Sequence, residues 1–169
     1  DNRVGVLIGN GGGFFQPQIV FNATDPRSVA ISDLDGDGDL DLALASNSTD
    51  VVRVLLNLGT GTFQTNQRPS AGNGTTSIAI DDLNQDGVPD LAVVNQNSFD
   101  VSVLLGNRNG TFQTQQRFDV GSIPTSVAIH DLNRDGTLDL VEANSGPGDD
   151  ESVLLGNGDG TFQAQQRYD

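Results

Sequence analysis

The chain has 169 residues and a formal net charge of −15, from 23 acidic and 8 basic residues. This acidic excess excludes a nucleic-acid binder, which needs a basic stripe. Cysteine is absent and there is one histidine, so disulfides, thiol catalysis and cysteine-based metal sites are excluded. No apolar run approaches the roughly 20 residues that span a bilayer, and no signal peptide is visible. Because the chain starts at Asp1, we expect a processed protein or a fragment.

The first 24 residues carry a degenerate copy of an element that recurs along the chain. The sequence V-L-I-G-N-G-G-G-F-F-Q ends at Gln16, and related V-L-L…G-T-F-Q segments end at Gln64, Gln113 and Gln163. Such Gly- and Asn-rich tracts between apolar runs favour tight hairpins. We therefore expect residues 1–24 to form the last two strands of a sheet, as a half-blade.

Three full copies of a longer unit follow this half-blade. The segment Ser28–Ala43 recurs at Ser77–Ala92 and Ser126–Val141, with a spacing of 49 residues each time. Four short strands are expected in each copy, the fourth after the G-T-F-Q turn. The first three are expected at 28–31, 40–46 and 51–57, at 77–80, 90–95 and 100–105, and at 126–129, 138–144 and 151–155.

Tandem four-stranded units of this length are typical of β-propeller blades. An immunoglobulin-like array would need about seven strands and about 100 residues per unit, and a parallel β-helix uses much shorter repeats. The sequence therefore predicts an all-β, propeller-type fold of three complete blades after the half-blade. The expected blade boundaries are 25–73, 74–122 and 123–169.

Each full copy has an Asp-rich loop between its first two expected strands, with the pattern D-x-(D/N)-x-D-G-x-x-D. Side-chain oxygens at positions 1, 3, 5 and 9 and a backbone carbonyl at position 7 can surround a hard cation, and Gly at position 6 permits the sharp turn. Oxygen ligands favour Ca²⁺ over zinc or copper. The alternative is a set of solvated acidic turns. The predicted ligands of the three calcium sites are Asp33, Asp35, Asp37, Asp39 and Asp41, then Asp82, Asn84, Asp86, Val88 and Asp90, then Asp131, Asn133, Asp135, Thr137 and Asp139.

The third loop also satisfies the EF-hand pattern, because Glu142 stands at its twelfth position. An EF-hand requires a helix on each side of the loop, whereas strands are expected here. We therefore interpret Glu142 as lying outside the cage, where it faces the propeller channel or solvent.

These motifs resemble the FG-GAP/VCBS-type repeats, the calcium-binding blades of integrin α-subunit heads and of many bacterial surface and secreted proteins. The resemblance rests on the nine-residue loop, the D-L-A or D-L-V that follows it, and the G-T-F turn with Phe63, Phe112 and Phe162. The Phe-Gly and Gly-Ala-Pro segments of that family are missing, so the resemblance is closer to the bacterial VCBS style. It implies Ca²⁺ in the loop between strands one and two, and gives no support for an integrin-like ligand site.

Other polar positions are interpreted as structural or as surface features. His130 has no repeated partner, and the Gln-rich tracts 113–116 and 163–166 are expected in the outer strand, where polar residues blunt an exposed edge. The Phe of each G-T-F turn is expected to pack between blades, with a sugar platform as the alternative. Four possible N-glycosylation sequons, or chance matches, begin at Asn22, Asn47, Asn73 and Asn109.

The leading interpretation is a non-enzymatic, extracellular or cell-surface calcium-binding scaffold or adhesion module, because the available carboxylates belong to the repeated loops. Such blades would assemble with further copies of the chain, or with the missing blades of a longer one, into a ring or a filament. The alternatives are a carbohydrate-binding, lectin-like propeller and an excerpt of a larger cell-surface propeller protein. Glycans and cell-surface proteins are therefore the other expected partners, without a membrane span.

Overall fold

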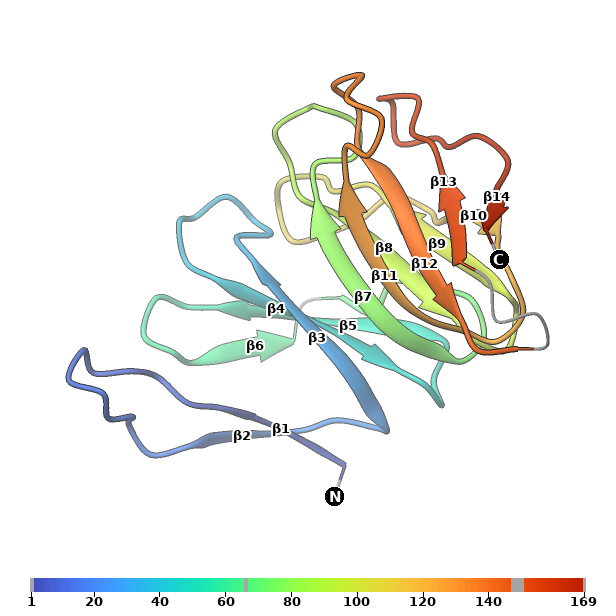
Figure 1. Cartoon of the computed structure of the whole chain (residues 1–169). Coiled ribbons are helices and arrows are strands. Elements are labelled where there is room, and N and C mark those ends of the chain that lie inside the picture. Colours follow the sequence, from blue (N-terminus) through green and yellow to red (C-terminus); the bar gives the residue numbers. More distant parts are fainter. Residues whose placement is uncertain (1, 66, 147–150, 169) are drawn as a thin grey trace.

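The computed structural model describes residues 2–65, 67–146 and 151–168 (Figure 1). These residues form strands joined by turns and loops. No helix among them is long and apolar enough to cross a membrane. The strands confirm the all-β expectation, and the sheets follow one another along the chain without closing into a ring.

The strands pair into four antiparallel sheets, in each of which neighbouring strands follow one another in sequence. The half-blade contains β1 (Arg3–Val6) and β2 (Ile19–Asn22). The first blade contains β3 (Pro26–Ser32), β4 (Asp41–Ser46), β5 (Val51–Asn57) and β6 (Phe63–Thr65). The second contains β7 (Thr75–Asp81), β8 (Asp90–Asn95), β9 (Asp100–Leu104) and β10 (Gln116–Asp119). The third contains β11 (Pro124–His130), β12 (Asp139–Asn144), β13 (Glu151–Leu154) and β14 (Gln166–Tyr168).

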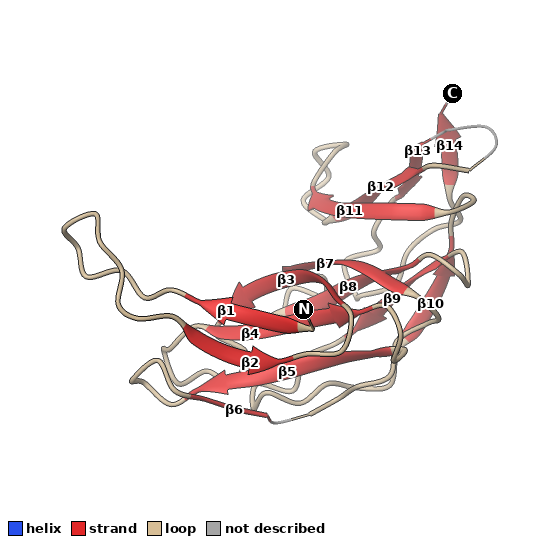
Figure 2. Ribbon diagram, turned by 90° about the horizontal axis from the view of Figure 1, so that it is seen from below, coloured by secondary structure: helices blue, strands red, loops and turns tan. Residues whose placement is uncertain are grey.

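The register of the first hairpin is the same in all three blades. The last pair of each ladder joins Ser32 to Asp41, Asp81 to Asp90, and His130 to Asp139. Each Asp-rich loop is therefore held between two paired strands, with its ninth residue as the first residue of the second strand. The hairpin between β1 and β2, in contrast, projects away from the other sheets (Figure 2).

Apolar side chains on both faces of the middle strands form the cores between blades. Val52, Val54 and Leu56 of the first blade pack with Ile78 and Leu91 of the second. Similar clusters join the second blade to the third, and the first blade to the half-blade. Because each internal sheet is covered on both faces, strands β4 and β8 are apolar at successive positions as well as at alternate ones.

The position of Glu142 corrects the expectation that it faces the channel or solvent. Glu142 lies in β12 and is only 1% exposed. It is on the same face of the strand as Leu140, which packs against the second blade. In the second blade the corresponding position is Val93, a member of a core between blades. Glu142 therefore lies at the boundary between two blades, because the alternation along β12 directs it there.

The glutamine tracts also lie differently from the expectation that they form the outer strands. Strands β10 and β14 begin only at Gln116 and Gln166. The Gln115 side chain instead turns inward and accepts a hydrogen bond from the Ser102 hydroxyl at 2.6 Å. Most of each tract therefore precedes the outer strand, and one glutamine of each, Gln115 and Gln165, binds a serine of the neighbouring strand.

Candidate metal centre

The Asp-rich loops curl because the side chain at position 1 accepts hydrogen bonds from backbone amides further along the loop. In the first loop, Asp33 accepts from the amides of Gly36 at 2.8 Å and Gly38 at 3.0 Å. The φ angle of Gly38, at position 6, is 94°, in the left-handed region that glycine adopts without strain. The same backbone turn recurs at Gly87 and Gly136.

Positions 3 and 5 repeat this arrangement. In every loop the position 3 oxygen accepts from the amide of position 5, and the position 5 oxygen accepts from the amide of position 7. The side chains at positions 3 and 5 are therefore held by the backbone in all three copies. This common frame directs the oxygens of positions 1, 3 and 5 toward one region of the loop.

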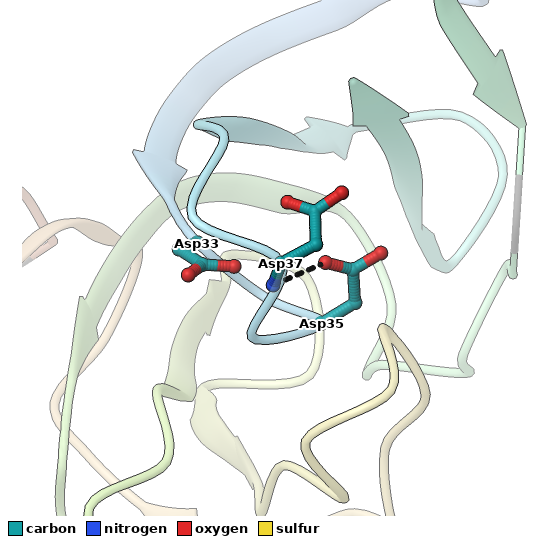
Figure 3. Close-up of side chains that lie close together, drawn as sticks. All are labelled: Asp33, Asp35 and Asp37. Atoms are coloured by element: carbon teal, nitrogen blue, oxygen red, sulfur yellow. Dashed lines mark hydrogen bonds between the residues drawn. The ribbon is translucent and has the colours of Figure 1, made fainter. Parts of the chain in front are cut away.

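In the first loop this frame brings three carboxylates together. Asp33, Asp35 and Asp37 each offer an oxygen, and these atoms lie within 4.8 Å of one another (Figure 3). Burial, together with the charges of Asp37 and Asp33, raises the pKa of Asp35 above its ordinary value. Three anionic groups at such distances repel one another, and a bound cation would offset that repulsion. The donor set fits a hard cation such as Ca²⁺.

The second and third loops relieve this repulsion without a cation. Asn84 donates from its amide nitrogen to Asp86 at 2.9 Å, and Asn133 donates to Asp135 at 2.8 Å. The hydroxyl and amide of Thr137, with the Asn133 side chain, lower the pKa of Asp135. Among the described residues, only the first loop gathers three acidic groups that could hold a metal ion. The expectation of three calcium sites is therefore supported for one loop.

The carboxylate at position 9 lies outside this acidic group and clamps the loop to the third strand. Both oxygens of the buried Asp41 accept backbone amides, from Leu34 and Asn57, each at 2.8 Å. Asp90 and Asp139 make the equivalent pairs of bonds in their own blades. Burial raises the pKa of Asp90 to about 6. A ligand role for these residues stays a prediction, whereas their clamping role is visible in each blade.

The residues at position 7 turn their side chains toward the hairpin between the third and fourth strands. The Asp39 carboxylate lies beside Gly59, and the Thr137 hydroxyl donates to the Gly156 carbonyl at 3.3 Å. The Val88 side chain is buried. The expected metal contact of the position 7 carbonyls stays a prediction.

Hydrogen bonds also connect loops across the blade boundaries, which sequence reasoning missed. The Gly110 amide donates to the Leu34 carbonyl at 3.0 Å, and Gln85 donates to the Gly136 carbonyl at 2.8 Å. Within the second blade, Arg108 donates to the carbonyl of Gly87 at 3.1 Å. A signal for Arg108 was present, because the other two copies have glycine at this left-handed position, where its φ is 58°.

The remaining candidate residues lie on the surface or at its edge. Asn22 ends β2 and is exposed, as are Asn73 and Asn109 in turns, whereas Asn47 is half-buried. The Asn109 side chain accepts from the amide and hydroxyl of Thr111. Glycosylation of these sequons stays a prediction. His130 is exposed at the end of β11.

Comparison with known families agrees with the repeat seen in the structure. A model of the FG-GAP-like repeat matches the chain twice, over residues 33–93 and 82–142. Each match begins at position 1 of an Asp-rich loop and ends within the second strand of the next blade. A comparison with curated proteins finds no match. The two matches together cover more than half of the chain, which therefore belongs to the FG-GAP-like repeat family.

Proposed function

We propose that this protein is a non-enzymatic, calcium-binding blade module of an extracellular or cell-surface scaffold. The observation that carries the proposal is the group of three carboxylates of Asp33, Asp35 and Asp37, held within 4.8 Å by a repeated backbone turn. Ca²⁺ accepts six to eight oxygen ligands in flexible geometry, whereas Mg²⁺ demands a smaller octahedral cage. A loop that also offers backbone carbonyls suits the larger ion.

Calcium in the first loop would stabilise the boundary between two blades. Leu34, which lies inside this loop, is 2% exposed in the core shared with the second blade, and its carbonyl accepts from the Gly110 amide of that blade. Its own amide donates to Asp41. An ion that orders the loop would therefore also order the contact of Leu34 with the second blade, so its proposed role is structural rather than catalytic.

Adhesion or assembly through blade faces is the second part of the proposal. Leu132 is 46% exposed on the third blade, whereas its counterparts Leu34 and Leu83 are each 2% exposed inside the stack. At the other end Val29 is 49% exposed, against 6% for its counterpart Ile78. The two end faces are thus equivalent to faces that pack together between internal blades. A second copy of the chain, or a further blade, would cover these end faces, and repeated contacts of this kind would build a ring or a filament.

Calcium titration with thermal melting tests the metal site. Wild-type protein should melt at a higher temperature in millimolar calcium than in EDTA. Asp37→Ala should remove the tightest step of a calorimetric titration, because it deletes one of the three gathered carboxylates. Asp119→Asn is the matched control, since Asp119 is exposed on β10 away from the loops. Superimposable melts of the wild type in calcium and EDTA would refute the proposal.

A further inference from the structure

Three of the eight arginines line one cavity between the half-blade and the first blade. Arg3, Arg53 and Arg68 surround a volume of about 570 Å³ together with Asn22 and Thr24, and none of the described residues that line it is acidic. This is unusual in a chain with 23 acidic residues. Without an anion, the cavity gathers like charges in a protein where carboxylates are abundant.

The fold itself does not require an arginine at position 53. The corresponding residues of the other blades are Ser102 and Ser152, and both are fully buried. The Ser102 hydroxyl accepts from the Gly72 amide at 3.2 Å and donates to Gln115 at 2.6 Å. Ser152 makes the equivalent bonds in the third blade. In the second and third blades a neutral serine hydroxyl therefore completes these hydrogen bonds, and in the first blade the positively charged Arg53 stands at the same position.

Arg68 also differs from its counterpart in the next blade. Arg117 occupies the same position in the second blade and forms an ion pair with Asp100. In the first blade, the residue at the position of Asp100 is Val51, which cannot pair with Arg68. At these three positions the first blade has two arginines and no carboxylate, whereas the second blade has one arginine and one carboxylate. The summed charge of the three side chains is therefore +2 in the first blade and zero in the second.

The guanidinium of Arg53 is held in place by neutral groups. It donates to the Asn22 carbonyl and, at 2.9 Å, to the Thr65 hydroxyl. Burial, and after it the charge of Arg68, lowers the pKa of Arg53. Within the described part of the chain, neither Arg53 nor Arg68 forms an ion pair, whereas Arg27 and Arg117 do. The positive charge at this cavity is fixed and available to a ligand.

A second cavity adjoins the first at Arg68. It has a volume of about 560 Å³ and is lined by Gln67, Gln113 and Phe112 as well as Arg68. Glutamine amides both donate and accept hydrogen bonds, and a phenyl ring offers an apolar surface. This lining suits a ligand with many hydroxyl groups and apolar C–H faces.

We propose that the Arg3–Arg53–Arg68 cavity binds the sulfate or carboxylate group of an acidic saccharide, whose sugar rings extend past Arg68 into the second cavity. Arginine binds oxyanions through paired N–H donors, and several arginines around one group favour an anion strongly. At physiological salt, charges beyond about 8 Å are largely screened, so the local arginines outweigh the net negative charge of the chain. The site is separate from the Asp-rich loops and does not depend on calcium.

Binding to dextran sulfate, unsulfated dextran and inorganic sulfate tests this site. The full chain is titrated at constant ionic strength in EDTA, so that calcium cannot bridge anions to the loops. Wild-type protein should bind dextran sulfate and leave unsulfated dextran unbound. Arg68→Gln and Arg3→Gln should each weaken binding by about tenfold, the effect of one charge-assisted hydrogen bond. Arg27→Gln is the control, because Arg27 is exposed and paired with Asp25.

The outcomes separate the parts of this proposal. Arg53→Gln also removes the bonds to Asn22 and Thr65, so the two exposed arginines carry the test. Equal affinities of wild type, Arg68→Gln and Arg3→Gln would overturn the cavity as the site. A tenfold loss in Arg27→Gln as well would reduce the binding to a general charge effect and overturn it too. Binding of inorganic sulfate without binding of dextran sulfate would overturn the saccharide ligand.

Discussion

Replacing Asp35 with asparagine should change the stability of the metal-free protein and its response to calcium in opposite directions. Asp35 stands where the other loops have Asn84 and Asn133, whose amides donate to the next carboxylate at 2.9 and 2.8 Å. In Asp35→Asn the new amide can donate to Asp37 in the same way, and one of three clustered charges disappears. We expect the metal-free protein to gain about 1 kcal/mol of stability. For a chain of this size that is a rise in Tm of about 2–4 °C.

With calcium the effect of Asp35→Asn should reverse. A cage with one carboxylate fewer binds Ca²⁺ more weakly, and its new amide bond to Asp37 must break before the oxygens can turn to the ion. If the affinity falls tenfold, from a free calcium concentration about 1,000 times Kd to about 100 times Kd, the stabilisation by calcium falls from about 4.1 to about 2.7 kcal/mol. Calorimetric melts with calcium and with EDTA measure both values.

The converse substitution, Asn84→Asp, controls this prediction. It places a third carboxylate beside Asp82 and Asp86 and removes the donor to Asp86. It should lower the Tm in EDTA and increase the rise in Tm caused by calcium. If Asp35→Asn lowered the Tm in EDTA, or left the calcium shift unchanged, then carboxylate repulsion would not control this loop, and the reasoning from the three gathered acids would fail.

Three further predictions concern the pH dependence of stability, self-association through the end faces, and the buried hydrogen bonds of Ser102. Burial raises the pKa of the Asp90 carboxyl to about 6, above the roughly 3.9 of an unfolded chain, so the metal-free native state binds a proton at Asp90 more tightly than the unfolded state does. The stability of the wild type relative to Asp90→Asn should therefore rise as the pH falls from 7 to 5 in melts with EDTA. A difference in stability that stays constant with pH would contradict this prediction. Leu132→Asp should reduce self-association in light scattering, whereas Phe99→Asp, in a turn of the second blade, should leave it unchanged; equal effects would count against assembly through the end faces. Ser102→Ala should destabilise the fold by about 1–3 kcal/mol in denaturant melts, because the buried amides of Gly72 and the Asn95 side chain lose their acceptor. The exposed Ser126→Ala should have little effect, and equal losses of stability would contradict the hydrogen-bonding role of Ser102.

The sequence predicted the blades well because their signals are local and repeated. Runs rich in Val, Ile and Leu mark the strands, and Asp-Gly and Asn-Gly pairs mark the turns. The predicted strand 51–57 agrees with β5, and 90–95 agrees with β8. First strands extend further than expected, to Ser32 for example, because backbone pairing continues to the edge of the loop after the apolar pattern has ended.

The details of the loops depend on contacts that a repeat pattern does not contain. Position 9 looks like another ligand, but Asp41 uses both oxygens to hold amides that are 7 and 16 residues away in sequence. Asparagine at position 3 offers an oxygen for a cation as aspartate does, yet in Asn84 the amide nitrogen faces Asp86. Glu142 looked exposed or channel-facing because charge argues for solvent, while strand alternation places it between blades. In each case the geometry of the folded chain outweighed what the residue type alone suggested.

Differences between the copies carry information that the repeat itself does not. Among the positions that agree in all three loops, the glycine at position 6 and the aspartate at position 9 are explained by backbone bonds within each blade, so folding alone would preserve them. Position 3 differs between the loops although its oxygen accepts the amide of position 5 in every copy, because aspartate and asparagine both supply that oxygen. Asp35 stands where the other loops have asparagine, and Arg53 stands where the other blades have serine; each changes charge while the surrounding backbone keeps its course. These two departures place an acidic group on one part of the first blade and a basic group on another. We therefore expect the first blade to carry the specific binding functions of this chain, and the other two to serve mainly as its support.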